Sequence, residues 1–303
     1  MTTSARNSTM KAPDAPYLVS VPANGTVVNA LTVDVEDYYH ALVFQEGLKQ
    51  RANGGFESRV ALSTGRVLNL LADRGVKGTF FVLGEVATEH PSLVRDIAKG
   101  GHEVACHSYH HVRVDGQRPD EFRAGIRRAK AILEDIAGQA VLGYRAPNFS
   151  IGRTERWAYE ILAEEGFRYD SSIYPIAHDR YGDRSAPRFP YEIWRNGDRA
   201  LIEFPIGTLR LFGTNLPIGG GGYFRLLPGR LIQSAIRRVN AVERKPVMFY
   251  FHPWELDPEQ PRPAMAWRHQ FRHYVGMKRH EAKLGRFLTR VPFGAIRDIL
   301  RLA

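Results

Sequence analysis

The chain has 303 residues, of which 44% are hydrophobic and 24% charged, and its formal net charge at pH 7 is +10. This length suits one large α/β domain with extensions, and this composition is that of a soluble globular chain with a buried core, so a wholly disordered chain is not expected. The single cysteine, Cys106, excludes an intramolecular disulfide, and no run of about 20 apolar residues is present to cross a membrane.

The first 26 residues form a polar leader that lacks the continuous apolar stretch of a signal peptide, and we expect it to be disordered. The next segment, 27–33, is apolar and β-branched and predicts a buried strand that ends at a cluster of acids. Farther along the chain, helical spacing of apolar residues predicts helices and short apolar runs predict strands, and the two alternate. The series is a helix over 59–74, a strand over 78–83, a helix over 91–99, a strand over 103–105, a helix over 119–136, a strand over 141–144, a helix over 154–165 and a strand over 167–170.

This alternation of strand and helix predicts a parallel sheet or barrel. Residues 176–225 break the pattern with many glycine, proline and aromatic residues and read as an inserted loop and hairpin region. A basic amphipathic helix over 228–243 and a last core strand over 247–251 follow. We therefore expect one domain over 27–256, and a basic C-terminal extension over 257–303 that packs on it.

Four polar clusters each follow an apolar run: residues 34–37, 107–111, 145–149 and 252–255. The C-terminal ends of parallel strands meet at one face of such folds, so these clusters are expected to form one site. His107 and His111 are four residues apart, which places both imidazoles on one side if the segment forms a helical turn. With a carboxylate they make a three-ligand set for a catalytic cation; the alternative is a chance cluster of surface histidines.

These residues resemble the polysaccharide deacetylases, also called the NodB-homology or carbohydrate esterase family 4 enzymes. The likeness rests on five ordered motifs between Val27 and Glu255. They are Thr32-Val33-Asp34, Gly101-His102-Glu103 leading to His107-Ser108-x-x-His111, Arg145-x-Pro147-x-Phe149, Asp170-Ser171-Ser172 and Phe251-His252. The start Asp34-Val35-Glu36-Asp37, the tract 220–228 and the segment 271–278 resemble a subgroup associated with exosortase and exopolysaccharide clusters.

The resemblance implies a distorted (β/α) barrel with a divalent metal at its mouth, Zn²⁺ first and Co²⁺, Ni²⁺ or Fe²⁺ as alternatives. It implies that Asp34 is the catalytic base, that His107 and His111 bind the metal, that Arg145 orients the base and that His252 is the general acid. Asp170 matches a fourth-motif position near that histidine. The family's first motif has two adjacent aspartates, whereas Val35 follows Asp34 here.

The carboxylate ligand of the metal is therefore Glu36 or Asp37. Glu36 is slightly favoured. In an extended segment, side chains two positions apart lie on the same face, so Glu36 is on the face of Asp34 and Asp37 is on the opposite one. Residues beside the motifs are expected to bind sugar rings, with ordinary packing as the alternative. They are Tyr38, Tyr39, Pro147, Phe149 and Trp254. Cys106 is expected to be a small buried hydrophobe.

The predicted function is metal-dependent removal of N-acetyl groups from sugars of a polysaccharide or glycan precursor in exopolysaccharide biosynthesis, with release of acetate. The alternatives are a hydrolase of small amides or cyclic ureides of the allantoinase type, and an inactive carbohydrate-binding scaffold. No nucleic-acid module is found. The expected location is the cytoplasm, where the basic C-terminal region could touch an anionic membrane face.

Overall fold

The structure is a computed structural model that describes residues 25–41, 44, 56–178 and 181–302. The expected leader lies almost entirely outside these residues. The central feature is a sheet of mostly parallel strands whose order is β10-β1-β2-β3-β4-β5-β7-β6. Its parallel members are β1 (Asn29–Val35), β2 (Thr79–Val82), β3 (Glu103–Cys106), β4 (Gly143–Tyr144), β5 (Tyr169–Asp170), β7 (Arg199–Glu203) and β10 (Met248–Phe251).

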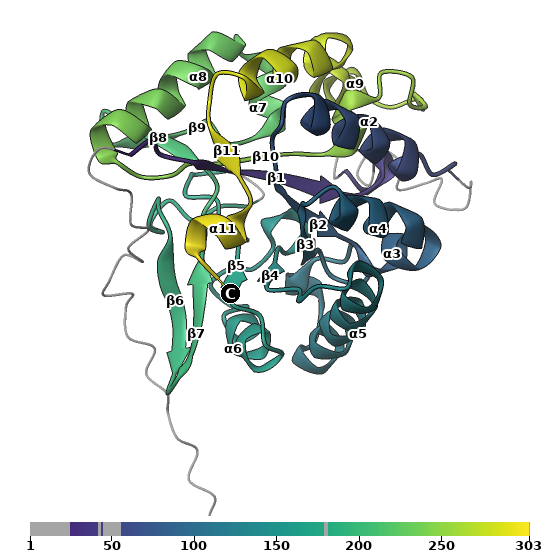
Figure 1. Ribbon diagram of the computed structural model, residues 1–303, viewed down its shortest axis with the longest axis vertical. Coiled ribbons are helices and arrows are strands. Elements are labelled where there is room, and N and C mark those ends of the chain that lie inside the picture. The colour runs from purple at the N-terminus through teal and green to yellow at the C-terminus, as the bar shows by residue number, and fades with distance from the viewer. Residues whose placement is uncertain (1–24, 42–43, 45–55, 179–180, 303) are drawn as a thin grey trace, which may run out of the picture.

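Helices cover this sheet, with α8 and α10 on one side and α5 and α6 on the opposite side (Figure 1). The expected helix–strand alternation and the α/β fold class are confirmed. The helices are α2 (Val60–Asp73), α3 (Gly84–Glu89), α4 (Pro91–Lys99), α5 (Pro119–Ala137), α6 (Trp157–Glu164), α7 (Gly221–Leu226), α8 (Gly229–Arg238), α9 (Trp267–Tyr274), α10 (His280–Leu288) and α11 (Ile296–Leu300). None of the helices in these described ranges is both long and apolar enough to span a bilayer.

The two ends of the parallel run are joined by irregular backbone instead of a strand pair. The Gly207 N–H donates to Met248 O of β10 at 3.0 Å, the Gly219 N–H donates to Gly207 O at 3.0 Å, and the Tyr250 N–H donates to Gly219 O at 2.7 Å. A Cβ at Gly207 or Gly219 would lie 2.6 or 2.3 Å from Met248 O, so only glycine allows this approach. The sheet is thus curved towards a barrel that is incompletely closed.

The region 176–225 contains two antiparallel hairpins, as its turn-rich sequence predicts. One is formed by β6 (Tyr191–Asn196) with β7, and the other by β8 (Thr208–Leu211) with β9 (Thr214–Pro217). Unlike a separate insertion, β7 also pairs in parallel with β5 and so extends the central sheet. Four residues after the end of β7, Gly207 makes the bond that draws the sheet towards β10.

The C-terminal residues also join the central sheet. β11 (Phe293–Gly294) pairs in parallel with Asn29 and Ala30 of β1. The Ile296 N–H then donates to Thr79 Oγ1 at 2.8 Å, and the Arg297 N–H donates to Glu103 Oε2 at 3.0 Å. This segment therefore bonds to three neighbouring strands at the end of the sheet opposite to the polar clusters.

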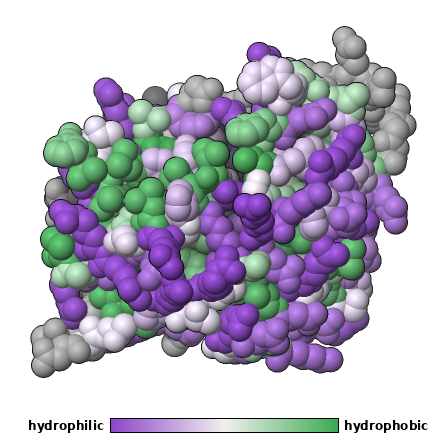
Figure 2. Space-filling view, turned by 90° about the horizontal axis from the view of Figure 1, so that it is seen from above, coloured by the Kyte–Doolittle hydropathy of each residue, from purple (hydrophilic) through white to green (hydrophobic). Residues whose placement is uncertain are grey.

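The predicted basic amphipathic helix is present as α8 and the turn that follows it. It buries Ile232 and Ile236 and exposes Arg230, Arg237 and Arg238. Figure 2, which looks down on the side of the molecule where α8 and α10 lie, shows hydrophilic side chains interspersed with smaller apolar groups. The basic residues of α8 are thus solvated, as the sequence pattern indicates.

Candidate metal centre and catalytic residues

The polar clusters come together because each follows the C-terminal end of a parallel strand. Asp34 is the penultimate residue of β1, His107 follows β3, Arg145 follows β4 and His252 follows β10. Neighbouring strands place these ends side by side, so residues up to 218 positions apart in sequence meet. The convergence predicted from the four clusters is what the structure shows.

Arg145 holds Asp34 in the interior of the site. Its Nη1 donates to Asp34 Oδ1 at 2.5 Å and to Thr32 Oγ1 at 2.9 Å, and the arginine side chain is fully buried. The other guanidinium nitrogens donate to the backbone carbonyl and the hydroxyl of Ser171. A guanidinium with so many fixed acceptors is rigid, so it orients the carboxylate of Asp34.

Glu36, His107 and His111 form a cluster that can hold a metal ion. One ligand atom from each lies within 4.8 Å of the others, and Glu36 Oε2 is 2.7 Å from His111 Nε2 and 3.8 Å from His107 Nε2. Burial alone raises the pKa of Glu36, but the charges of His111 and His252 and the hydrogen bonds from both ligand histidines lower it well below its usual range. The carboxylate is thus held in the ionised form that a cation requires.

The ring of His107 is fixed in the tautomer that suits a metal ligand. Its Nδ1 is 2.8 Å from Arg145 O, a carbonyl that can only accept, so Nδ1 carries a proton and Nε2 is the nitrogen that faces Glu36, where a neutral ring would offer its lone pair to a cation. The segment from His107 to His111 bends instead of forming the helical turn considered above, with Ser108 at a φ of 72°. The two imidazoles nevertheless meet, with ring centroids 5.5 Å apart.

Asp37 is directed elsewhere. Its Oδ1 accepts from the Arg59 N–H at 2.7 Å, and its Oδ2 accepts from Ser58 Oγ at 2.6 Å and from Tyr39 Oη at 3.1 Å. Asp37 thus fixes the backbone that leads into α2 and takes no part in the cluster of Glu36 with the two histidines. Of the two carboxylates between which the sequence left a choice, the geometry favours Glu36 as a ligand.

His252 faces Asp34 of β1 and Glu36 just after that strand, and Glu255 contacts its other ring nitrogen. Its Nε2 is 3.6 Å from Glu36 Oε1 and 4.0 Å from Asp34 Oδ2, while its Nδ1 is 3.0 Å from Glu255 Oε1. The Arg225 Nε in turn donates to Glu255 Oε2 at 2.8 Å. Burial lowers the pKa of His252, but the carboxylates of Glu36, Glu255 and Asp34 outweigh it and raise the pKa to about 9.

The carboxylate that contacts His252 is Glu255. Asp170, expected near that histidine, has its Oδ1 accepting from Ser172 Oγ at 2.6 Å and a hydrogen bond with Glu203. Sequence reasoning placed Glu255 in a polar cluster but gave it no role, although the spacing of three from His252 in a tight turn is a usable signal. Arg225, on α7, carried no such signal.

The aromatic residues expected to bind sugar rings are mostly engaged within the protein. The indole of Trp254 is stacked between His252 and His273, at 4.9 and 4.5 Å, and its N–H donates to Glu36 Oε1 at 3.3 Å. Its two faces are therefore not free for a sugar, and it orients Glu36 instead. Tyr38 is buried and Tyr39 donates to Asp37.

Pro147 and Phe149 lie on the short turn after Arg145. Pro147 is buried, and Asn148 and Phe149 have φ values of 56° and 52°, in the left-handed region that side-chain-bearing residues rarely adopt. Such residues cost of order 1–3 kcal/mol each and persist where surrounding structure fixes them. Phe149 is half-buried, with its ring 5.1 Å from that of Tyr250. Cys106, as expected, is a small buried residue, and burial raises its thiol pKa to about 12.

Asp170 and Glu203 form a fully buried acidic pair. Burial raises the pKa of Asp170 to about 6, and burial together with the charge of Asp170 raises the pKa of Glu203 well above its usual range. Both acids therefore bind protons more tightly in the folded than in the unfolded chain. Their contribution to the free energy of unfolding is complete below about pH 4 and is lost as pH rises through 6 and beyond.

We expect Glu203→Gln to flatten this pH dependence, because the amide cannot ionise and the remaining carboxyl no longer faces a second negative charge. Between about pH 5 and 8 the free energy of unfolding of the variant should fall less steeply, by up to about 1.4 kcal/mol per pH unit. Urea denaturation at a series of pH values measures this, with Glu160→Gln, an exposed residue of α6, as control. Parallel curves for the variant and the wild type would contradict the assignment.

Comparison with known proteins divides the chain into two matched regions. Residues 41–168 match the family model described as polysaccharide deacetylase, and residues 171–301 match a domain of unknown function. A peptidoglycan-N-acetylglucosamine deacetylase of Bacillus cereus is 37% identical over 98 residues, which are 32% of this chain and 36% of that protein. A chitooligosaccharide deacetylase of Rhizobium leguminosarum bv. trifolii is 50% identical over 100 residues, 33% and 44% of the two chains. The alignments thus span less than half of these curated relatives.

Solved structures match over nearly the whole chain. A protein of Mycobacterium smegmatis, provisionally assigned as a polysaccharide deacetylase, is 25% identical with a TM-score of 0.61, and 96% of this chain and 93% of that chain are covered. The allantoinase Puue is 17% identical with a TM-score of 0.60, over 95% and 93% of the two chains. The second likeness shows the fold alone. The α/β architecture is therefore shared beyond the region that the first family model matches.

Proposed function

We propose that this protein hydrolyses the N-acetyl group of an N-acetylated sugar in a polysaccharide or glycan precursor and releases acetate, since residues 41–168 match the polysaccharide deacetylase family model and deacetylases of N-acetylated sugars are among its relatives. One observation carries the proposal. A carboxylate fixed by an arginine, a cluster suited to a cation and a histidine with a raised pKa converge, with Nε2 of His252 within 4.0 Å of carboxylate oxygens of both Asp34 and Glu36.

Amide hydrolysis needs a proton acceptor for the attacking water and a proton donor for the departing amine. Asp34 is the acceptor in this proposal, since Arg145 holds its Oδ1 and leaves Oδ2 on the side of His252. His252 is the donor, because its raised pKa keeps Nε2 protonated near neutral pH until the sugar nitrogen takes the proton. Arg145 and Glu255 have no direct role on the substrate in this proposal; they hold Asp34 and His252 and so act as positioning residues.

Glu36, His107 and His111 are the residues that would hold a divalent cation, with Zn²⁺ the first choice for one carboxylate and two imidazoles. Such a cation, when bound, supplies positive charge for the acetyl oxygen and for the water. The proton on His107 Nδ1 and the bond from Trp254 to Glu36 orient two of these ligands in advance. A finer proposal, from the sequence motifs, is a role in exopolysaccharide biosynthesis.

The test is acetate release from N-acetylglucosamine oligomers by the purified full chain. Protein treated with a chelator is expected to lose activity, and stoichiometric Zn²⁺ is expected to restore it, because the three-residue cluster supplies no positive charge of its own for the carbonyl. If the chain binds zinc stoichiometrically but releases no acetate, the proposal is wrong, and hydrolysis of small amides such as allantoin is the next assay. If it binds no metal, a scaffold role takes precedence.

Glu255→Gln is expected to move the pH profile of the reaction. Loss of the Glu255 charge lowers the pKa of His252 from about 9, so the alkaline fall in kcat/KM should occur at a lower pH. Measurement of kcat/KM between about pH 6 and 10 checks this, since that ratio reports the free enzyme. Zinc content should be unchanged, because Glu255 is not in the ligand cluster. An unchanged alkaline limb would rule out the role of Glu255.

A further inference from the structure

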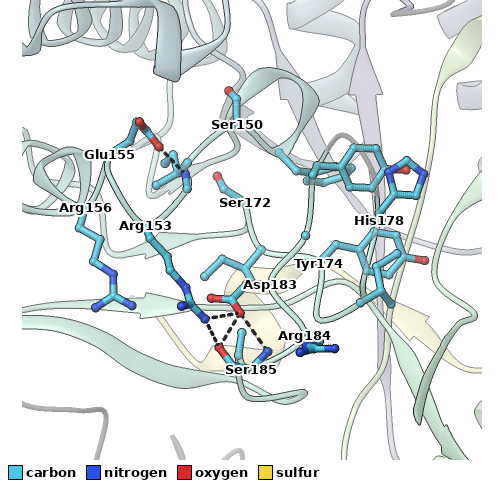
Figure 3. A pocket seen from close by; sticks show the side chains of 18 of the residues that line it. Ser150, Arg153, Glu155, Arg156, Ser172, Tyr174, His178, Asp183, Arg184 and Ser185 are labelled. Atoms are coloured by element: carbon cyan, nitrogen blue, oxygen red, sulfur yellow. Dashed lines mark hydrogen bonds and ion pairs between the residues drawn. The ribbon is translucent and has the colours of Figure 1, made fainter.

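A cavity of about 710 Å³ lies beside the proposed site and has no part in the mechanism above. Its walls come from the loop after η3 (Pro147–Phe149), the loop after β5 and the segment 181–187. Figure 3 shows Arg153 and Arg156 on one side of the cavity and Tyr174 and His178 on the opposite side. The cavity therefore has a basic wall and an aromatic wall.

The basic wall has more positive charge than its acidic residues neutralise. Four arginines line the cavity, and two of them are paired: Arg113 with Asp115 at 2.5 Å, and Arg153 with Asp183 at 3.4 Å. The third acid, Glu155, is occupied by the Gly152 N–H at 3.0 Å and by Thr154 Oγ1 at 2.6 Å.

The other two arginines, Arg156 and Arg184, are exposed. Within the described part of the chain, neither makes a side-chain hydrogen bond or an ion pair. A guanidinium that lines a cavity without a protein acceptor is suited to a carboxylate or a phosphate, whose oxygens match its planar set of donors. The cavity therefore offers two unused anion-binding groups.

The aromatic wall is a parallel stack. The ring centroids of His178 and Tyr181 are 4.1 Å apart, and those of Tyr174 and Tyr181 are 6.2 Å apart with an angle of 7° between the planes. Tyr181 has a ring stacked on each side, so the stack is a rigid boundary of the cavity and does not offer the faces of Tyr181 to a ligand. A ligand with a ring and an anionic substituent would place its ring beside this wall and its anion at one of the free arginines.

The cavity reaches the catalytic residues through Phe149, which belongs to both. The Phe149 ring is 5.1 Å from the ring of Tyr250, which is 5.7 Å from the ring of His252. The Arg145 guanidinium lies 5.9 Å from the centre of the Phe149 ring and 5.7 Å from that of Tyr250. The cavity is therefore linked to His252 through the neighbouring rings of Phe149 and Tyr250, so one glycan could occupy both the cavity and the catalytic site.

From these contacts we propose that the cavity binds an anionic group, a carboxylate or a phosphate, on the unit next to the acetylated sugar, so that the substrate is an acidic glycan. This inference rests on the proposed deacetylase function and names its substrate class. Arg156 or Arg184 binds the oxyanion, and the aromatic wall of Tyr174, His178 and Tyr181 borders the ring. In this proposal, an arginine that has no protein partner among the described residues binds the anionic group of the substrate.

The experiment measures binding separately from catalysis. Trigalacturonate, which has no acetyl group, and neutral maltotriose are titrated into the full-length chain by calorimetry. The variant is Arg156→Gln/Arg184→Gln, and the control is Arg118→Gln/Arg230→Gln, which removes the same charge from exposed positions elsewhere. We expect trigalacturonate affinity to fall at least about tenfold in the variant and to be unchanged in the control, as loss of charge-assisted hydrogen bonds requires.

N-acetylglucosamine 1-phosphate is titrated as a third ligand. The inference is overturned if the wild type binds both trimers equally. It is also overturned if the variant binds trigalacturonate and the sugar phosphate as tightly as the wild type does. If only the sugar phosphate loses affinity in the variant, the anion is a phosphate. Acetate release from neutral N-acetylglucosamine oligomers is measured in parallel. Release without any anion site leaves the function standing and removes the inference. An anion site without release from any N-acetylated sugar removes the deacetylase function and, with it, the substrate named here, and leaves only an anion-binding cavity.

Discussion

Asp34→Asn is expected to reduce acetate release by at least about 100-fold, because an amide cannot accept the proton of the attacking water. The variant keeps the three residues of the cation cluster, so zinc stoichiometry should stay that of the wild type. Steady-state kinetics on N-acetylglucosamine oligomers, together with metal analysis of the same sample, check both expectations. The two readouts separate loss of the proton acceptor from loss of the site.

The same substitution leaves the guanidinium of Arg145 buried without its counter-charge. Removal of one member of a buried ion pair costs roughly 3–5 kcal/mol, so the variant should also unfold at lower denaturant concentration. Asp120→Asn, at an exposed position of α5, is the matched control and should change neither property. Retention of more than a tenth of the activity in a folded Asp34→Asn protein would rule out Asp34 as the base.

Glu36→Gln and Asp37→Asn are expected to have opposite consequences, although the two residues are adjacent. Glu36→Gln should weaken zinc binding by at least about 100-fold, because even residues that only orient metal ligands cost 10- to 100-fold when lost. Asp37→Asn should leave zinc affinity unchanged and lower stability by about 1 kcal/mol, because its carboxylate accepts the Arg59 N–H at the start of α2. Competition with a chromogenic chelator and urea denaturation measure the two quantities.

The difference in zinc affinity between Glu36→Gln and Asp37→Asn is the result that decides which carboxylate binds the metal. Loss of zinc in Asp37→Asn but not in Glu36→Gln would exchange the roles assigned to them here. Equal losses in both, with intact folding, would mean that the short segment after β1 acts as a unit. Either result would also require a different origin for the low pKa of Glu36.

The sequence predicts the fold well where one local pattern determines one element. The helix over 119–136 and the strand over 247–251 are found within one residue of these bounds, because apolar spacing and β-branched runs report burial directly. The convergence of Asp34, His107 and Arg145 is also predictable, since parallel strands bring their C-terminal ends together.

The rest depends on contacts that no local pattern encodes. Glu255 contacts His252 from the same turn, but Arg225, the residue that holds Glu255, comes from another helix. Trp254 looks like a platform for sugars until His252 and His273 are seen on its two faces. Likewise, the arginine excess of the cavity appears only when the loops around it are placed together.

The pairing of β1 has a consequence for how the chain folds. Thr32 of β1 bonds to a residue 217 positions later, and Asn29 bonds to one 263 positions later. Loops of this length make folding slow, because their closure entropy is lost before the contacts are gained. During synthesis, the strand that carries Asp34 therefore waits for β10 and β11 to leave the ribosome. Its apolar residues need protection in that interval, which makes this chain a candidate for chaperone assistance.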